Sequence, residues 1–589
     1  MSILLRRWIT NVAFVALVAF VWREGREGPD LSAEDAGDLR PGVRFVESAR
    51  DLGLSFEHRP TSLDPRIANV APQVAAVGAA VSVVDVDVDG DPDLYVVTSE
   101  DGGQNALFVN RGDGTFEDRA AEAGLADLNR DGVGCSMGSV WGDFDGDGLD
   151  DVFVIMYGRP RLFRNLGDLR FEDVTERAGV GRWVNANAAT WFDYDRDGNL
   201  DLFVGCYFSE EHDLWNVRST KIMQDSFEFS RNGGRNFLYR GNGDGTFREV
   251  AEEVGVVGTR WTFAAVAADF DRDGWPDLYV ANDYGPEELF LNRGGERFEL
   301  AEGIGLERES KSGMCVALGD VFNEGRLSVF VTNISKRGYL FQGNNLRVNY
   351  LDHGAGMVQF ADGPTADCGW AWGAQFGDLD NDGRQDLVVV NGFISASQER
   401  DYWYQMSKLG IATADVIADA SHWPPIEDRS LSGYERTRVL FNDGGQARFV
   451  EAGPAVGIDD RYDGRAVALL DGDGDGRLDV VIANQNGPLL YYRNVSDTGH
   501  RWVSFALEGA GGNTGALGAE VTVSFAGGTQ MQVVTSACGF SSQNERRLHF
   551  GLGAAPGPVE ARVRWPSGLE QTLADVELDR VHSLREPSP

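Results

Sequence analysis

Aspartates recur in this chain in the pattern D-x-D-x-D-G-x-x-D, in which three alternate carboxylates precede a glycine and a fourth follows it. A turn of this kind places the side-chain oxygens of positions 1, 3 and 5 around one point, and position 9 can add both of its oxygens. Hard oxygen ligands in that number suit Ca²⁺, which takes about six to eight of them. The pattern therefore predicts calcium sites. The sequence holds six intact copies, formed by Asp85, Asp87, Asp89 and Asp93; Asp143, Asp145, Asp147 and Asp151; Asp193, Asp195, Asp197 and Asp201; Asp269, Asp271, Asp273 and Asp277; Asp378, Asp380, Asp382 and Asp386; and Asp471, Asp473, Asp475 and Asp479.

Calcium explains the repetition of these turns better than an acidic turn without a metal. Four anionic groups on one turn repel one another strongly unless a cation lies between them. A metal-free acidic turn would account for a single copy, but poorly for six. The turn differs from an EF-hand, since its last acidic residue falls at position 9 rather than 12 and a β-rich run follows it. We expect Ca²⁺ to be the cofactor, with a structural role.

A worn copy lies between the fourth and the last two intact copies. It retains Asp320, Glu324 and Gly325, but Phe322 and Ser328 replace two of the carboxylates. Because those two ligands are missing, we predict no tight calcium site in this fifth loop. With the worn copy included, the chain contains seven units.

A second pattern, centred on a phenylalanine, runs in step with the aspartates. Phe171 precedes Asp193 by 22 residues, and Phe247 precedes Asp269 by the same 22. Each unit has three or four short apolar runs separated by turns, and units of roughly 40 to 60 residues with four strands are typical of propeller blades. The predicted fold class is all-β, a seven-bladed β-propeller with calcium-binding loops plus a small C-terminal β-domain. The phenylalanines of this pattern are Phe45, Phe116, Phe171, Phe247, Phe298, Phe360 and Phe449, and the sixth copy is degenerate.

The order of the elements predicts how the ring closes. The first unit begins with the Phe45 element, whereas the last unit ends at residues 490–494. The first strand should therefore lie beside this last segment and tie the two ends of the repeat array together.

Two units are longer than the others. Asp193 and Asp269 are 76 residues apart and Asp378 and Asp471 are 93 apart, against 50 for the closest pair, Asp143 and Asp193. Insertions therefore lie near residues 208–235 and 393–436. Long loops in a compact domain carry function more often than short ones.

Composition excludes some classes of partner. Acidic residues outnumber basic ones by 92 to 53, which gives a formal net charge of -39. Nucleic acid is therefore not expected to bind, because a phosphate backbone requires clustered Lys and Arg. The five cysteines are widely spread without a C-x-x-C pair, and no two of the seven histidines are four residues apart. Neither a disulfide framework nor a zinc site is predicted.

The first 24 residues predict export. Arg6 and Arg7 precede an uncharged run from Trp8 to Trp22, which as a helix would span about 22 Å, less than a hydrocarbon core of about 30 Å. That length favours a cleaved signal, whereas the bulky end of the run, without a small-residue cleavage site, favours an uncleaved anchor. We favour the anchor, with residues 25–42 as a linker. The rest of the chain is then periplasmic or extracellular, or secreted if the segment is cleaved, and it meets the membrane only through this segment.

A different β-pattern follows the last acidic repeat. From about Trp502 apolar and polar residues alternate, with Gly-rich turns, over a small domain of roughly 90 residues. This domain resembles the ASPIC/UnbV domain, and the acidic repeats resemble the FG-GAP/VCBS type, so that together they resemble the cartilage acidic protein family. The motifs that carry the first resemblance are residues 513–519, 541–543, 549–553 and 565–568.

The resemblance extends from Phe45 to Leu584. It implies an extracellular or periplasmic calcium-binding propeller, which we place at residues 43–497, and an appended β-domain at 498–587. It does not imply one settled activity, because a shared architecture does not supply one. The chain departs from the family pattern in its fifth loop, its sixth Phe element and the 393–436 insertion.

Two features of the last domain could suggest catalysis. His549 lies in an alternating strand pattern, so we expect its ring to be hydrogen-bonded to a turn. Trp565-Pro566-Ser567-Gly568 reads as a strand end and a tight turn. Ser567 has no His and Asp partners visible in the sequence, so a nucleophile there is not expected.

Two functions remain open. The first is an exported, membrane-anchored binding or scaffolding protein for a protein or glycan ligand, and its oligomeric state is not predicted. The alternative is an enzyme, a lyase or natural-product cyclase, with its site at the propeller funnel under the 393–436 insertion. Arg400, Tyr402, His422 and Trp423 would then line a pocket, whereas in a non-catalytic insertion they would pack against the ring. No catalytic constellation is apparent, so binding is favoured.

Overall fold

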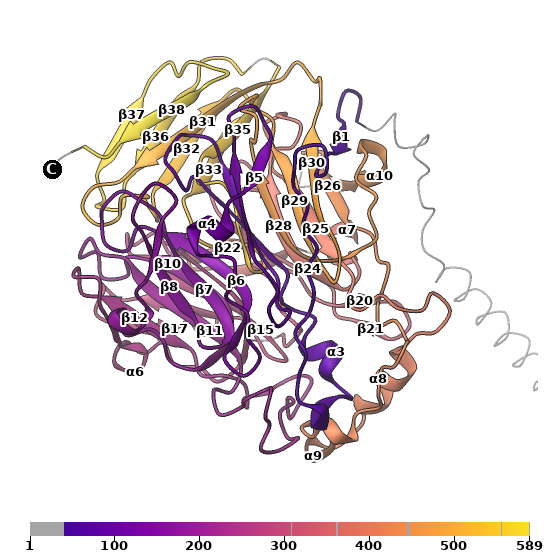
Figure 1. Ribbon diagram of the computed structural model, residues 1–589. Coiled ribbons are helices and arrows are strands. Elements are labelled where there is room, and N and C mark those ends of the chain that lie inside the picture. The colour runs from indigo at the N-terminus through magenta and orange to yellow at the C-terminus, as the bar shows by residue number, and fades with distance from the viewer. Residues whose placement is uncertain (1–39, 308, 361–362, 445–447, 555, 588–589) are drawn as a thin grey trace, which may run out of the picture.

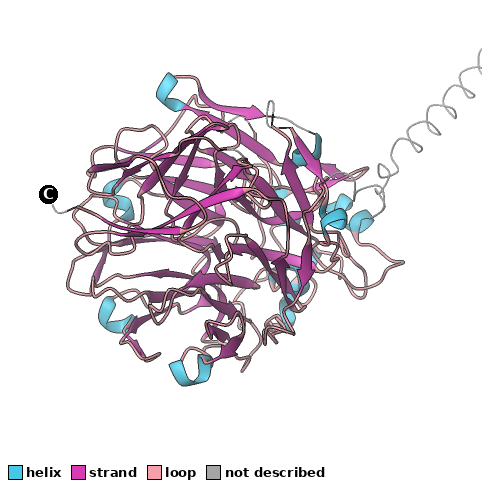
Figure 2. Cartoon of the chain, turned by 90° about the horizontal axis from the view of Figure 1, so that it is seen from above, coloured by secondary structure: helices cyan, strands magenta, loops and turns pink. Residues whose placement is uncertain are grey.

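The computed structural model describes residues 40–307, 309–360, 363–444, 448–554 and 556–587. Over these residues almost every element is a β-strand, and the helices are short (Figure 1, Figure 2). The fold is therefore all-β, as the repeats predicted. The predicted segment 1–24 lies outside the described residues, and among the helices that are described none combines the length and apolarity needed to cross a membrane.

Strands along the repeats group into four-stranded antiparallel units. The second and third units join edge to edge through β7 and β10, and a separate hairpin, β20 (Ser335–Lys336) and β21 (Leu340–Phe341), lies within the fifth. The units are β2 (Ala80–Val84), β3 (Asp93–Val97), β4 (Ala106–Asn110) and β5 (Phe116–Asp118); β6 (Gly134–Gly142), β7 (Asp151–Gly158), β8 (Arg161–Asn165) and β9 (Phe171–Asp173); β10 (Val184–Phe192), β11 (Asp201–Phe208), β12 (Phe237–Gly241) and β13 (Phe247–Glu249); β14 (Trp261–Ala268), β15 (Asp277–Asp283), β16 (Glu288–Asn292) and β17 (Phe298–Leu300); β18 (Ala317–Gly319), β19 (Ser328–Val331), β22 (Asn345–Tyr350) and β23 (Gly356–Phe360); β24 (Ala371–Gly377), β25 (Asp386–Asn391), β26 (Arg438–Asn442) and β27 (Phe449–Glu451); and β28 (Asp463–Leu470), β29 (Asp479–Gln485), β30 (Leu489–Asn494) and β1 (Phe45–Glu47).

Both repeated patterns fall at fixed places in these units. The acidic turn joins the first and second strands, and the second strand begins at the ninth position, as β3 does at Asp93. The outer strand begins at the repeated phenylalanine in every unit but the fifth, as β5 does at Phe116, whereas β23 (Gly356–Phe360) ends at its phenylalanine. Between units a short helix often ends at a glycine in the left-handed region, such as Gly124 with φ +78°. These helices are α4 (Ala120–Ala123), α5 (Thr175–Ala178), α6 (Ala251–Val254) and α10 (Gly453–Val456), and the fifth unit adds η2 (Leu351–His353) and, after β23, α7 (Gly363–Ala366).

The first strands of the units pack side by side around a centre. β2 contacts β6, β6 contacts β10 and β10 contacts β14, while β18 contacts β24, β24 contacts β28 and β28 contacts β2. The units of β14 and β18 share a core in which Val266 and Val316 are buried. Because these strands are covered on both faces, the side chains that point to either face are buried. All nine residues of β10, for example, are buried.

The first and last strands close the array. β1 pairs antiparallel with β30, with Phe45 opposite Asn494. This pairing confirms the prediction that the Phe45 strand lies beside the last segment of the repeats. The last unit therefore takes its outer strand from the beginning of the chain.

A repeated asparagine holds neighbouring units together. In the fourth unit the side-chain amide of Asn292 donates to the carbonyl of Tyr194 in the third acidic loop, at 2.8 Å, and its Oδ1 accepts from Gly295 N at 2.8 Å. Asn292 is fully buried. Asn110, Asn165, Asn442 and Asn494 make equivalent bonds to the acidic loop of a neighbouring unit.

We expect Asn292→Ala to lower the free energy of unfolding by about 2–4 kcal/mol, because the buried Tyr194 O and the half-buried Gly295 N lose their partners at about 1–3 kcal/mol each. Urea denaturation measures the change. The control Asn242→Ala removes an exposed amide from the same kind of turn and should cost less than about 0.5 kcal/mol. Equal effects of the two variants would contradict the role given to Asn292.

The carboxy-terminal residues form two further small sheets at one end of the array (Figure 1). In one sheet a central strand pairs antiparallel with one neighbour and parallel with the other. The other sheet is four-stranded and antiparallel. Their strands are β31 (Arg501–Glu508), β35 (Leu548–Gly553) and β38 (Val581–Arg585) in the first, and β33 (Gly528–Val533), β32 (Glu520–Phe525), β36 (Glu560–Arg564) and β37 (Glu570–Leu573) in the second.

Residues 534–547, which we call the plug segment, run from this domain into the centre of the array. Its short strand β34 (Ser542–Gln543) pairs parallel with β2, where Ser542 lies opposite Val81. Gln543 Oε1 accepts from Trp141 N at 3.0 Å, and Ser536 Oγ accepts from Trp191 N at 2.7 Å. The domain is thus threaded into the repeats rather than only appended to them.

The same segment reaches the remaining inner strands. Phe540 packs edge-on against Phe263 of β14, with ring centroids 5.6 Å apart. Gly539 N donates to Val316 O, just before β18, at 2.6 Å. Further along, Gln375 of β24 donates to Cys538 O at 2.8 Å and Leu469 N of β28 donates to Asn544 Oδ1 at 2.9 Å. Inner strands that are far apart in sequence thus all contact the plug segment.

The predicted insertions lie at the other end of the array from the carboxy-terminal domain (Figure 1). They pack on each other, since Met223 N donates to Ala418 O at 3.1 Å and Ala420 N donates to Thr220 O at 2.8 Å. Short helices of the insertion and of the segment before β2 meet here: α8 (Trp403–Leu409), α9 (Ala414–Ile417), η3 (Ala420–His422), η1 (Pro65–Ile67) and α3 (Ala71–Val74).

Candidate metal centres

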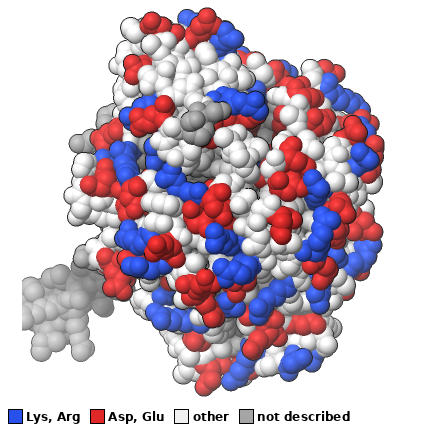
Figure 3. All heavy atoms as spheres, turned by 90° about the vertical axis from the view of Figure 1, so that its left-hand side faces the viewer, with Lys and Arg blue, Asp and Glu red and all other residues white. Residues whose placement is uncertain are grey.

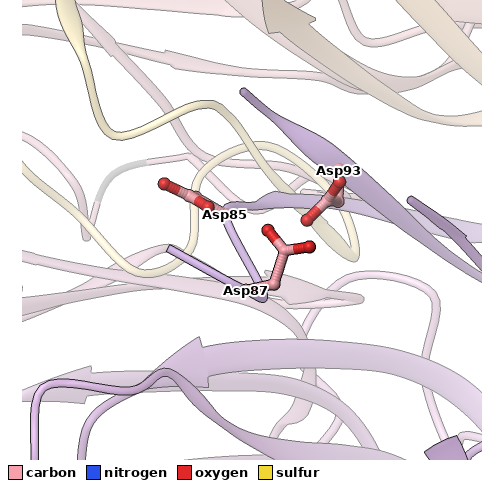
Figure 4. A group of neighbouring side chains, drawn as sticks. All are labelled: Asp85, Asp87 and Asp93. Atoms are coloured by element: carbon pink, nitrogen blue, oxygen red, sulfur yellow. The ribbon is translucent and has the colours of Figure 1, made fainter. Parts of the chain in front are cut away.

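The predicted carboxylates of the acidic loops converge. In the first loop, oxygens of Asp85, Asp87 and Asp93 all lie within 4.8 Å of one another, and Figure 4 shows Asp87 and Asp93 turned toward each other with Asp85 beside them. Four other loops bring three carboxylates together in the same way: Asp143, Asp145 and Asp151; Asp193, Asp195 and Asp197; Asp269, Asp271 and Asp273; and Asp378, Asp380 and Asp386.

Backbone hydrogen bonds shape each loop around its first aspartate. Asp85 Oδ1 accepts from Asp89 N at 3.1 Å, and its Oδ2 accepts from Gly90 N at 3.0 Å. Gly90 has φ +96°, which explains the invariant glycine of the pattern. Position 4 is also left-handed, with Val88 at φ +60°, a constraint that the pattern did not reveal. Position 1 makes the same pair of bonds at Asp143, Asp193, Asp269, Asp378 and Asp471.

Positions 5 and 9 also hold the backbone. Asp93 Oδ1 accepts from Asn110 N at 2.7 Å and its Oδ2 accepts from Val86 N at 2.9 Å, so both oxygens that we expected to face an ion already have a donor. Position 9 therefore links the loop to two strands. The same double bonding occurs at Asp151, Asp201, Asp277 and Asp386, and position 5 accepts from the residue two further along at Asp89, Asp147, Asp197, Asp273, Asp382 and Asp475.

Burial and mutual repulsion make these carboxylates reluctant to ionise. Burial, more than the nearby aspartates, raises the pKa of Asp93 to about 8 and that of Asp193 to about 7. Asp145 Oδ1 and Asp195 Oδ1 are buried without a hydrogen-bond partner among the described residues. A hard cation between these oxygens would satisfy both deficits, so the donor set fits Ca²⁺.

Arginines that the sequence analysis did not consider lie beside several loops. Arg164 Nε lies 2.5 Å from Asp145 Oδ2, and Arg240 Nη2 lies 2.6 Å from Asp195 Oδ2. Both precede the last residue of a third strand, and Arg493 occupies the same position beside Asp473 in the last loop. More widely, acidic and basic side chains are interspersed over the face shown in Figure 3. In the sequence an arginine precedes both Asn165 and Asn494, and this recurrence could have revealed the contact.

The fifth loop is held by protein donors. Asp320 Oδ2 accepts from Gly325 N at 2.7 Å and from Met531 N of β33 at 3.1 Å. Phe322 packs edge-on against Phe360, with ring centroids 5.4 Å apart. The carboxy-terminal domain thus contacts the loop that lacks two carboxylates.

Other acidic loops also face that domain. Arg564 Nη2 donates to Asp269 Oδ2 at 2.8 Å, and Asp471 N donates to Glu545 Oε2 at 2.9 Å. His549 is buried; its Nε2 lies 2.6 Å from Asn381 Oδ1 in the sixth loop, and burial lowers its pKa to about 3. His549 therefore stays neutral and structural, and Ser567 lies in a turn where Gly568 N donates to Trp565 O at 2.8 Å.

Residues proposed for an enzymatic pocket do not come together. Arg400 is exposed and pairs with Asp428, and His422 is exposed. Tyr402 is buried, and its hydroxyl donates to Pro424 O. Only Trp423 of the four lines a cavity at this end of the array. The expectation that all four line one pocket was wrong, because three of them bond within the insertion or face solvent.

Comparisons with known proteins agree with the repeats and the last domain. The ASPIC and UnbV model matches residues 509–589, and the FG-GAP-like repeat model matches residues 143–204, 228–280 and 269–331. Cartilage acidic protein 1 of Mus musculus is 22% identical over 530 residues, which cover 86% of this chain and 73% of that protein. The Homo sapiens protein is 22% identical over 531 residues, or 86% of this chain and 72% of that protein.

Solved structures that resemble this chain include a lectin from Burkholderia pseudomallei. It is 14% identical, with 72% of this chain and 97% of that chain covered and a TM-score of 0.39. Taken with the repeat and domain matches, the relatives identify the sequence: this chain is a homologue of cartilage acidic protein 1 that combines FG-GAP-like repeats with a carboxy-terminal ASPIC and UnbV domain.

Proposed function

We propose that this chain is an exported calcium-binding protein that presents a rigid surface to a ligand. Its repeats, residues 43–497, would form a seven-bladed β-propeller, and residues 498–587 the second domain. The convergence of three carboxylates in each of several acidic loops, some of them buried, is the observation that carries the calcium proposal. Residues 1–24 would anchor the chain in the membrane, or direct its secretion if they are cleaved.

The proposed ions have a structural role. Asp145 Oδ1 and Asp195 Oδ1, which lack donors, would be ligands in the second and third loops. Bound Ca²⁺ supplies positive charge where crowded carboxylates otherwise repel one another. Because the loops contact the carboxy-terminal domain, as Asp269 contacts Arg564, neutralising them would also hold that domain in place.

The ligand, a protein or a glycan, is proposed to bind at the end of the array that carries the insertions. Large apolar side chains are exposed there: Tyr404 of α8 is 63% exposed, Ile411 is 89% and Phe229 is 60%. Exposed apolar side chains gathered near one cavity favour an interaction surface. The enzyme alternative has less support, since only Trp423 of the four residues that it required lines the cavity.

A glycan array and a panel of purified extracellular proteins test this proposal. We expect the wild-type chain to bind a ligand, and the double variant Tyr404→Ser, Ile411→Ser to bind it at least about tenfold more weakly with an unchanged melting temperature. The control Val358→Ser removes another exposed apolar side chain, 45% exposed, from the outer strand β23 and should bind as the wild type does. Equal binding by all three chains would contradict this placement of the ligand.

A further inference from the structure

A cavity of about 470 Å³ lies where the two insertions meet the ends of the inner strands. Tyr207 of β11, Trp261 and Phe263 of β14, and Trp372 of β24 form its wall on the side of the repeats, and Trp403 of α8 belongs to the wall on the side of the insertion. Its volume is in the range of small-molecule sites in proteins. None of the acidic loops contributes to it.

The aromatic rings around the cavity form one continuous belt. Tyr207 stacks on Phe263 with centroids 4.0 Å apart and meets Trp261 edge-on at 4.8 Å. Trp261 meets Tyr284 at 5.9 Å, and Phe263 meets Trp372 at 5.7 Å. Aromatic faces carry partial negative charge, so a belt of this kind attracts cations.

The charged groups of the cavity have one sign. Asp283, at the end of β15, is 6% exposed, and its Oδ2 accepts from the Tyr207 hydroxyl at 2.8 Å. Glu228 lies on the lining from the 208–235 insertion. No Lys, Arg or His occurs among the described residues that line the cavity. Phosphates, carboxylates and other anions are therefore poor ligands for it.

The belt already holds one cation on its outer side. The Arg465 guanidinium lies 4.3 Å from the Trp372 ring and 5.5 Å from the Phe393 ring. Arg465 is fully buried, and its donors are used by backbone carbonyls such as Ala76 O at 2.6 Å and Phe393 O at 2.6 Å. Arg465 thus shows that these rings accept a cation, while it does not itself line the cavity.

Several donors on the lining lack acceptors. The indole Nε1 of Trp370 and that of Trp372 are buried and have no partner among the described residues, and the side-chain amide of Gln73 has none for either of its polar atoms. Buried donors of this kind are normally satisfied, by protein, water or ligand. A ligand that carries an oxygen acceptor beside its cationic group would supply a partner for the N–H donors among these groups.

We propose that this cavity binds a quaternary ammonium compound, whose cationic group lies against the aromatic belt near Asp283 and whose carbonyl or ether oxygen accepts from the unpartnered donors. This site goes beyond the proposed function. It lies away from the calcium loops and does not depend on a protein or glycan bound at the surface.

Isothermal titration with two isosteric probes tests the proposal. Benzoylcholine carries a trimethylammonium group and an ester, and 3,3-dimethylbutyl benzoate replaces only the nitrogen by carbon. Burial raises the pKa of Asp283 to about 7, so the titration is done at pH 8. The protein is saturated with calcium, which separates this test from that of the metal sites. We expect the cation to bind at least about tenfold more tightly than the neutral ester.

Variants assign the difference to the cavity. Asp283→Asn should weaken the binding of benzoylcholine by about tenfold and leave the affinity for the neutral ester unchanged. The control Asp415→Asn, which changes an exposed aspartate of the 393–436 insertion, should alter neither affinity. If Asp283→Asn fails to fold, Phe227→Leu serves instead, because it keeps apolar volume beside Tyr284 but removes an aromatic ring. This variant should weaken only the binding of the cationic probe. Equal affinities for the two probes, or no binding of the cation at millimolar concentration, would overturn the proposal.

Discussion

Removal of calcium from the full chain should lower its melting temperature by about 17 °C, and readdition should restore it. An ion in 100-fold excess over its dissociation constant stabilises the folded state by about 2.7 kcal/mol per site, so six sites contribute about 16 kcal/mol. With an unfolding entropy of about 2.1 cal/mol/K per residue over roughly 450 residues of repeats, that free energy corresponds to a shift of about 17 °C. Differential scanning calorimetry with and without a chelator measures it.

Calcium titration of the chelated protein gives the matching stoichiometry, which we expect to be about six because the fifth loop lacks two carboxylates. Asp145→Asn should remove one ion, since it changes a buried carboxylate with an unpartnered oxygen. Asp168→Asn, a control in an outer turn of the same unit, should remove none; its side chain is 93% exposed. A melting temperature indifferent to calcium would defeat the assignment of the acidic loops.

Loss of the plug segment's polar contacts should give the second-largest loss of stability. Ser536, Gln543 and Asn544 accept from the backbone amides of three inner strands, at Trp191, Trp141 and Leu469. The triple variant Ser536→Ala, Gln543→Ala, Asn544→Ala leaves these buried amides unpaired, at about 1–3 kcal/mol each. We expect the free energy of unfolding to fall by about 3–9 kcal/mol, measured by urea denaturation in calcium.

A control in the same domain removes hydroxyls without removing buried contacts. Ser524→Ala with Ser567→Ala changes two exposed serines and should alter stability by less than about 0.5 kcal/mol each. If the triple variant behaves like this control, the plug segment contributes packing at most, and the two domains should then unfold in separate transitions. A single cooperative transition that shifts with the triple variant would support the threaded arrangement.

Local patterns made much of this structure predictable. Each second strand begins at the ninth position of an acidic turn and most outer strands begin at the repeated phenylalanine, because a turn closed by aspartate and glycine and an apolar run are encoded within a few residues. The pairing of Phe45 with Asn494 was also predictable, because the first strand of the chain is an outer strand and the last unit lacks one. The first strand therefore has to complete the last unit.

Contacts within the 393–436 insertion were harder to anticipate. Tyr402 and His422 have the residue types of a catalytic pair, but the hydroxyl of Tyr402 bonds to Pro424 and His422 faces solvent. The type of a residue determines which chemistry its side chain can perform. Its orientation in an irregular segment depends on how that segment packs. Asp283, a carboxylate that does line the cavity, stands at the end of an ordinary strand and belongs to no sequence motif.

The sequence by itself determined the all-β repeats, the positions of the acidic turns and the kind of ion that their oxygens suit, because these follow from spacings shorter than one unit. Only the tertiary structure decided that the plug segment occupies the centre of the array and that an aromatic cavity forms at the opposite end. Both depend on residues hundreds of positions apart, such as Trp141 and Gln543 or Tyr207 and Trp403, whose meeting is set by the closure of the ring and not by any local pattern.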